Sequence, residues 1–150
     1  MRALVQRVTR AEVRVEGAVV GAIRRGFLVL LGVSVEDDDR VASRMAEKVR
    51  KLRVFEDDAG KMNLDLEQAG GECLVVSQFT LYGDARGGNR PGFSAAARPE
   101  QAERSYLQFV RSLSEKGVPV ATGVFGAMMD VELVNDGPTT LWLDSAELFT

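Results

Sequence analysis

Histidine is absent from this 150-residue sequence, and cysteine occurs once, as Cys73. Without histidine, a single chain cannot form a Ser/His/Asp triad, a Cys/His pair or a histidine-based metal site. Any hydrolysis must therefore use carboxylates, backbone dipoles, water or groups of the substrate. A lone cysteine inside an apolar run cannot form an intrachain disulfide, which favours a reducing compartment, the cytoplasm.

Long apolar runs and a strong charge of one sign are also missing. No run is long enough to span a bilayer, and Arg2 and Arg7 interrupt the apolar N-terminus, unlike the pattern of a signal peptide. The formal net charge of −3 argues against a protein coated in nucleic acid, while leaving room for a local basic patch. The composition, 45% hydrophobic and 27% charged, predicts one globular domain over residues 1–150.

Periodicity predicts an α+β fold. Apolar alternation and short apolar runs predict strands over residues 11–15, 18–23, 27–33, 54–55, 61–64, 72–81, 118–123, 129–133, 134–135 and 141–143. Apolar residues at helical spacing predict one helix that starts at Asp37–Asp39 and a second that runs from Pro99 to Lys116. Because most strand connections look local, we expect a mostly antiparallel sheet or open β-barrel with two packed α-helices.

The stretch from Glu72 to Leu81 is an apolar strand pattern that turns polar before it ends. Alternation places Gln78 and Thr80 on one face of the predicted strand and Ser77 on the other. Polar groups in such a position need hydrogen-bond partners. The sequence therefore predicts that either the fold or a ligand satisfies them.

A hydroxyl nucleophile is one interpretation of this stretch. Ser77 or Thr80 would attack, with Asp84 as the base a turn away, although hydroxyls in strands more often bond neighbouring backbone groups. Cys73 is disfavoured, because a thiolate is unstable among apolar residues. No phosphate-binding glycine loop, metal-ligand cluster or carboxylate pair with useful spacing appears elsewhere, so the sequence predicts no metal and no cofactor.

Two basic segments are candidates for contacts with RNA. Residues 82–98 combine several glycines with Arg86, Arg90 and Arg98, and a functional loop and a plain flexible connection explain this composition equally well. In the first predicted helix, basic side chains fall on one line, at Arg40, Arg44, Lys48 and Lys51. A solvated helix face is the simpler explanation of that line.

Gly137 and Pro138 lie between the last two predicted strands. By themselves they predict an ordinary turn with a trans peptide, because only about 5–6% of X–Pro bonds in folded proteins are cis. Residues 77–81 (SQFTL) together with residues 135–140 (NDGPTT) resemble the D-aminoacyl-tRNA deacylase family. The resemblance runs from residues 4–8 through residues 60–64 to the last strand.

The resemblance implies a homodimer that hydrolyses the ester joining a D-amino acid, or glycine mischarged on alanine tRNA, to the 3′-terminal adenosine of tRNA. The peptide between Gly137 and Pro138 would be cis and would reach across the dimer to exclude L-amino acids. The backbone amides of Phe79 and Thr80 would polarise the ester carbonyl. The 2′-hydroxyl of the terminal adenosine, and no side-chain nucleophile, would assist catalysis. The pocket for the aminoacyl-adenosine would be formed by Ser77, Gln78, Phe79 and Thr80.

Two positions depart from the family pattern. Thr139 stands where an apolar residue is expected, which bears on the shape of the pocket. Gly92 stands where serine is usual, in the loop whose Arg86, Arg90 and Arg98 would meet the tRNA. Two other functions stay open. One is a non-catalytic dimeric module that binds tRNA or protein through this loop and the basic helix face. The other is a hydrolase of small esters, which is less favoured because no base is visible.

Overall fold

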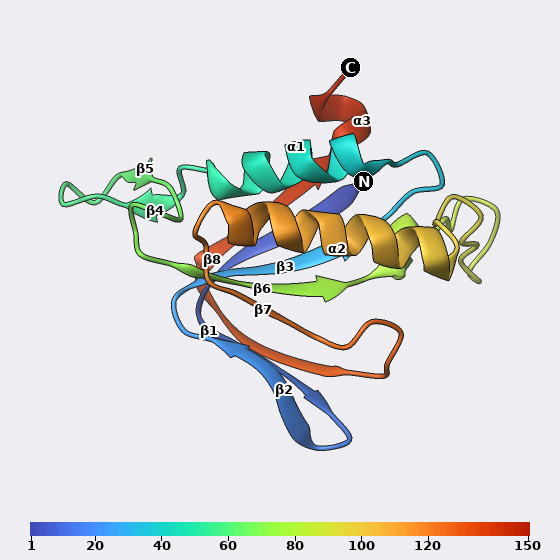
Figure 1. Ribbon diagram of the computed structural model, residues 1–150, viewed down its shortest axis with the longest axis horizontal. Helices are drawn as coiled ribbons and strands as arrows, with labels where there is room; N and C mark the ends of the chain where they lie inside the picture. The colour runs from blue at the N-terminus through green and yellow to red at the C-terminus, as the bar shows by residue number, and fades with distance from the viewer.

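The computed structural model describes residues 1–150 as a curved sheet with two long helices on one face (Figure 1). The strands are β1 (Arg2–Val15), β2 (Ala18–Ile23), β3 (Gly26–Gly32), β4 (Phe55–Glu56), β5 (Met62–Leu64), β6 (Glu72–Ser77), β7 (Val120–Thr122) and β8 (Asp130–Asp144). The helices are α1 (Asp39–Arg50), α2 (Pro99–Glu115), α3 (Ser145–Leu148) and a 3₁₀ helix, η1 (Phe79–Tyr82). None of the helices could cross a membrane, being too short or too polar.

Strand β1 organises the sheet. Its first half pairs with β3, its second half pairs with β2, and β8 runs antiparallel along its other edge. The order continues from β3 to β6 and β7 in parallel pairings, which require long crossovers that contain α1 and α2. A Cβ on Gly21 of β2 would overlap the carbonyl oxygen of Thr122 in β7, so these two strands approach closely and the sheet nearly closes into a barrel.

The core lies on both faces of this sheet. A cluster of 21 buried residues fills the layer between the sheet and helices α1 and α2, where the rings of Phe27 and Phe55 lie 5.0 Å apart. A second cluster of seven buried residues, Leu28 and Leu74 among them, lies on the inner face of the curved sheet. The predicted α+β fold with two packed helices is confirmed, whereas the expectation of mostly local strand connections is wrong for β3, β6 and β7.

Both predicted long helices are confirmed: α1 begins where the sequence indicated, and α2 begins and ends close to the predicted residues. Asp38 caps α1, because its carboxylate accepts the N–H of Val41 at 2.9 Å. Pro99 occupies the first turn of α2, where a missing N–H costs no hydrogen bond. Gly117, at φ +88°, follows the C-cap residue Lys116.

The strand predicted over residues 72–81 is wrong at its end, because β6 stops at Ser77. The N–H of Gln78 still reaches the carbonyl of Leu31 at 2.8 Å, but β3 itself ends one residue later, at Gly32. Residues beyond Gln78 have no strand to pair with and form the 3₁₀ helix η1 instead. Gln78 and Thr80 therefore do not share a strand face.

The last two predicted strands are also wrong in one respect, since residues 130–144 form the single strand β8. In its register with β1, Gln6 pairs with Thr140 and Val8 pairs with Asn135. Four residues of β8, numbers 136–139, thus stand opposite Arg7 alone. Strand β8 pairs with β1 on both sides of these four residues. The expected turn is therefore an outward bulge within one strand.

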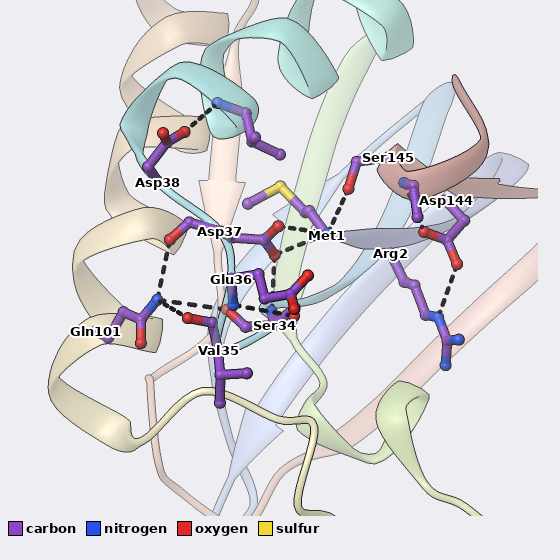
Figure 2. A network of polar contacts seen from close by, with 12 residues as sticks. Met1, Arg2, Ser34, Val35, Glu36, Asp37, Asp38, Gln101, Asp144 and Ser145 are labelled. Carbon is purple, nitrogen blue, oxygen red and sulfur yellow. Dashed lines mark hydrogen bonds and ion pairs between the residues drawn. The ribbon is translucent and has the colours of Figure 1, made fainter. Parts of the chain in front are cut away.

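Asp37 joins several segments of the fold (Figure 2). Its carboxylate lies 2.7 Å from the Met1 ammonium and accepts the N–H of Ser34 at 2.7 Å. The same ammonium donates to the hydroxyl of Ser145 at 2.6 Å, and Gln101 of α2 donates to the Asp37 carbonyl at 2.9 Å. This buried cluster ties the start of β1 to α2 and α3.

Asp37→Asn is expected to lower the free energy of unfolding by about 3 kcal/mol, because it leaves a buried ammonium without its negative partner. Urea unfolding followed by circular dichroism measures the loss. Asp39→Asn is the matched control: Asp39 is exposed and forms no ion pair, so its replacement should cost less than about 1 kcal/mol. Equal stabilities of the Asp37→Asn protein and the unmodified protein would contradict the role given to this cluster.

Candidate active site

The 3₁₀ helix η1 begins with two backbone N–H groups that have no hydrogen-bond partner in the chain. Phe79 and Thr80 begin this helix, so their N–H groups have no carbonyl partner within it. Neither group donates to a loop carbonyl, whereas the neighbouring N–H groups of Leu81 and Gly83 do. Phe79 and Thr80 are both exposed. Two adjacent free donors at the end of a strand can stabilise an oxyanion.

Gln78 and Thr80 meet although the predicted strand does not reach them. The amide of Gln78 donates to the hydroxyl of Thr80, which bends the segment back on itself. A Cβ on Gly32 would lie 3.0 Å from the Gln78 carbonyl oxygen and 3.2 Å from Leu81 Cβ, so η1 packs directly on the end of β3. Ser77, the last residue of β6, is half-buried beneath it.

No free base lies beside these hydroxyls. The Arg86 guanidinium donates to both carboxylate oxygens of Asp84, at 2.9 and 2.8 Å, and holds the pKa of that carboxyl far below its usual range. Burial raises the pKa of the Cys73 thiol to about 12. The hypothesis of a Ser77 or Thr80 nucleophile activated by Asp84 therefore gains no support, because a carboxylate so committed is a poor proton acceptor.

The basic loop of residues 82–98 lies next to η1. Phe93 packs edge-on against Phe79, with ring centroids 5.1 Å apart. Gly92 exchanges both backbone hydrogen bonds with Asp84, at 2.8 and 2.9 Å. Arg90 and Arg98 are exposed and form no ion pair, whereas the charge of Arg86 is compensated by Asp84. Two of the three loop arginines are thus free to meet an anion.

Two of the four basic residues of the predicted line along α1, Arg44 and Lys51, are engaged in contacts within the chain. Lys51 pairs with Glu47 at 3.0 Å, and the Arg44 guanidinium lies 4.1 Å above the ring of Phe149. This arrangement fits a solvated helix face better than a row of phosphate contacts. The structure also brings together no three side chains of the types His, Cys, Asp and Glu in a way that could hold a metal ion.

The bulge in β8 exposes Gly137 and Pro138, and the peptide bond between them is cis. Gly137 has φ +127°, and a Cβ there would lie 2.6 Å from the Thr139 hydroxyl and 3.1 Å from Arg7 Nη2, so only glycine fits. Thr139, the residue that departs from the family pattern, is buried, and its N–H donates to the side chain of Asn135 at 3.1 Å.

Arg7 is a functional candidate that the sequence reasoning missed. Its guanidinium is buried under the bulge, where it donates to the carbonyl oxygens of Asp136 and Val54 and lies 3.3 Å from the Asp136 carboxylate. The available signal was its position, since alternation along β1 places Arg7 on the inward face with Val5. A charged residue at a core position marks a buried partner or a site.

Within one chain the two candidate regions are far apart. Ser77 is paired with Leu31, which pairs in turn with Ala3 of β1, whereas the bulge lies opposite Arg7. Four residues of extended strand separate these positions, about 13 Å at about 3.3 Å per residue. A single chain therefore does not bring Gly137 and Pro138 to the Phe79 and Thr80 amides.

The fold matches that of known deacylases. A solved structure described as a probable eukaryotic D-amino acid tRNA deacylase superposes with a TM-score of 0.80 over 95% of this chain and 97% of the other, at 17% identity, a likeness that concerns the fold alone. The class of this protein, a hydrolase that acts on ester bonds, follows from a family model that matches most of the chain and from relatives of high identity. The chain belongs to the D-Tyr-tRNA(Tyr) deacylase family, whose model matches residues 4–144.

Several relatives cover nearly the whole chain. The D-aminoacyl-tRNA deacylase of Anaeromyxobacter dehalogenans is 62% identical over 99% of this chain and 100% of its own length. That of Thermus aquaticus is 58% identical over 98% and 97% of the two chains. A solved structure described as a c-Myc DNA Unwinding Element Binding Protein has a TM-score of 0.92 and 45% identity over 97% of this chain and 99% of the other. The family resemblance stated from residues 77–81 and 135–140 is confirmed.

Proposed function

We propose that this protein, acting as one catalytic domain over residues 1–150 in the cytoplasm, hydrolyses the ester of D-aminoacyl-tRNA and spares L-aminoacyl-tRNA. The observation that carries the proposal is the family match over residues 4–144, joined to two free backbone N–H groups in the SQFTL segment, residues 77–81. Glycine mischarged on alanine tRNA is a further substrate of the same site, because glycine lacks the side chain that distinguishes D- from L-amino acids.

The chemistry is ester hydrolysis without a side-chain nucleophile. The N–H groups of Phe79 and Thr80 donate to the ester carbonyl oxygen as it becomes an oxyanion, and Ser77 and Gln78 hold the aminoacyl-adenosine. The terminal 2′-hydroxyl assists the attack of water on the acyl carbon. The bond from that carbon to the 3′-oxygen breaks, and the 3′-oxygen leaves with a proton. The ion pair between Asp84 and Arg86 supports this assignment, because it leaves Asp84 a poor base.

The complete site belongs to a homodimer. Gly137 and Pro138 of each chain face the η1 helix of the other, and the prolyl peptide blocks the space that an L side chain would need. Two observations support this arrangement: within one chain the regions are offset by about 13 Å along the direction of β1, and both are exposed. The half-exposed face of β1 and β8, with Trp142 and Leu4 paired on it, supplies an apolar surface for a two-fold interface.

The decisive experiment compares D-tyrosyl-tRNA with L-tyrosyl-tRNA. We expect the D ester to be lost at least about 100-fold faster, because the L side chain would collide with the prolyl peptide. Release of labelled tyrosine measures both rates. Equal rates would refute the selection by chirality, and binding of tRNA without turnover would favour the non-catalytic tRNA-binding module.

A D-tyrosyl-tRNA that ends in 2′-deoxyadenosine serves as the control for mechanism. Its hydrolysis should be slow although it binds, because the assisting hydroxyl is missing. A simple tyrosine ester tests the remaining alternative: rapid turnover of an ester without RNA would identify a small-ester hydrolase.

A further inference from the structure

Arg2 connects the start of β1 to the η1 helix. Its Nη1 donates to the carbonyl oxygen of Leu81 at 2.8 Å, and Leu81 is the third residue of η1. On the opposite side, its Nε donates to the carboxylate of Asp144 at the end of β8, at 3.0 Å (Figure 2). One guanidinium thus joins three elements that are distant in sequence.

Aromatic rings hold the same guanidinium in place. Its central carbon lies 4.4 Å from the ring centroid of Tyr82 and 5.4 Å from that of Trp142. A planar guanidinium can stack on rings and donate in two fixed directions at once, which the single ammonium of lysine cannot do. The backbone of Arg2 is fixed as well, because the preceding Met1 is held by Asp37 and Ser145.

The contact with Leu81 bears on the two free donors. Within this short helix the N–H of Leu81 bonds the carbonyl of Gln78, at 3.3 Å, so these residues move as one unit. Fixing the Leu81 carbonyl therefore fixes the directions in which the N–H groups of Phe79 and Thr80 point. Such donors act only when they are aimed at the developing oxyanion, and a misplacement of about 1 Å can cost about 100-fold in rate.

We propose that Arg2 is a positioning residue for the Phe79 and Thr80 amides, an inference that rests on the proposed deacylase function. Arg2 does not touch the substrate ester. It holds η1 against β8 so that the two N–H groups keep their orientation in the transition state. Its removal therefore lowers kcat more than it raises KM.

The test compares Arg2→Met with Arg10→Met. Arg10 is the matched control, because it also lies on β1 and pairs with an acid of β8, Glu132, but it makes no contact with η1. With D-tyrosyl-tRNA, Arg2→Met should lower kcat about 10- to 100-fold with KM changed less than about threefold. Arg2→Lys should lie between Arg2→Met and the unmodified protein, since it retains one of the two hydrogen bonds. Arg10→Met should leave kcat within about twofold.

The backbone amide resonances of Phe79 and Thr80 give a second readout that needs no activity. In Arg2→Met they should shift and exchange faster with solvent, while Arg10→Met leaves them in place. Unchanged resonances, a normal kcat, equal losses in both variants or a pure rise in KM would each overturn the inference. If the unmodified protein fails to hydrolyse D-tyrosyl-tRNA, the proposed function fails, and the resonances still decide whether Arg2 positions η1.

Discussion

Replacement of the Phe79 N–H by an ester oxygen is expected to lower kcat for D-tyrosyl-tRNA about 100- to 1000-fold. Incorporation of 3-phenyllactate at position 79 makes this change and keeps the phenyl ring. The reason is electrostatic: a donor that strengthens its bond only as the oxyanion forms contributes to the transition state and little to substrate binding. Single-turnover kinetics measure the loss, and KM should change little.

The same replacement at Phe93 is the matched control, because Phe93 packs on the ring of Phe79 but its N–H lies outside η1. It should leave kcat within about threefold. Thr80→Ala tests the rival mechanism in the same assay: substantial activity is expected, whereas complete loss with the fold intact would favour a threonine nucleophile. A 3-phenyllactate protein with normal kcat would remove the Phe79 amide from the mechanism.

Arg7→Met is expected to lower kcat/KM for D-tyrosyl-tRNA about 100-fold and to reduce the preference for the D ester. Arg7 holds the Asp136 carbonyl and carboxylate, so without it the bulge that carries Gly137 and Pro138 loses its support. The buried guanidinium also holds the Val54 carbonyl. The free energy of unfolding should fall by about 2–3 kcal/mol, the usual range for hydrogen bonds to a charged group.

Both quantities are measurable, by the rate ratio of D- and L-tyrosyl-tRNA and by urea unfolding. Arg14→Met is the control on the same strand: Arg14 pairs with Glu12 and Glu132 and is far from the bulge, so the rate ratio should be unchanged. If the Arg7→Met protein retains the full ratio of D- to L-tyrosyl-tRNA hydrolysis rates, the bulge does not select the chirality of the amino acid.

Mixing the two defective proteins tests whether the site is shared between chains. Arg7→Met has a defective bulge and an intact η1, and the 3-phenyllactate protein has the reverse. In a homodimer with shared sites, random exchange of subunits gives about one half mixed dimers, each with one intact site, so about one quarter of the original activity should return. Recovery of no activity would mean that each site is built within one chain.

The sequence predicted those elements whose signal is local. The N-cap at Asp38, the proline in the first turn of α2 and the apolar stripes of the two helices depend on neighbours within a few residues, and the starts of both helices were predicted closely. The end of β6 could not be predicted in this way, because it depends on where β3 stops. Ser77 and Thr80 look like one strand in sequence, and they are separated only because the pairing of β6 with β3 ends at Leu31 and Ser77.

Arg7 shows the same limit at the candidate site. In sequence it is one of several arginines in the first strand, and its position opposite the bulge follows from the register of β1 with β8, more than 120 residues away. The resemblance in residues 77–81 and 135–140 identified the two regions but gave no distance between them. The register of the strands in the sheet determines how far apart they lie along β1.

By itself, the sequence determined the α+β class, the absence of histidine-based chemistry and the family, because composition, periodicity and motifs are properties of short segments. Only the tertiary structure decided which N–H groups are left free at η1 and that Arg2 and Arg7 support the two regions. These features depend on contacts between segments far apart in the chain. Such contacts are set by strand register and packing, which no local pattern encodes.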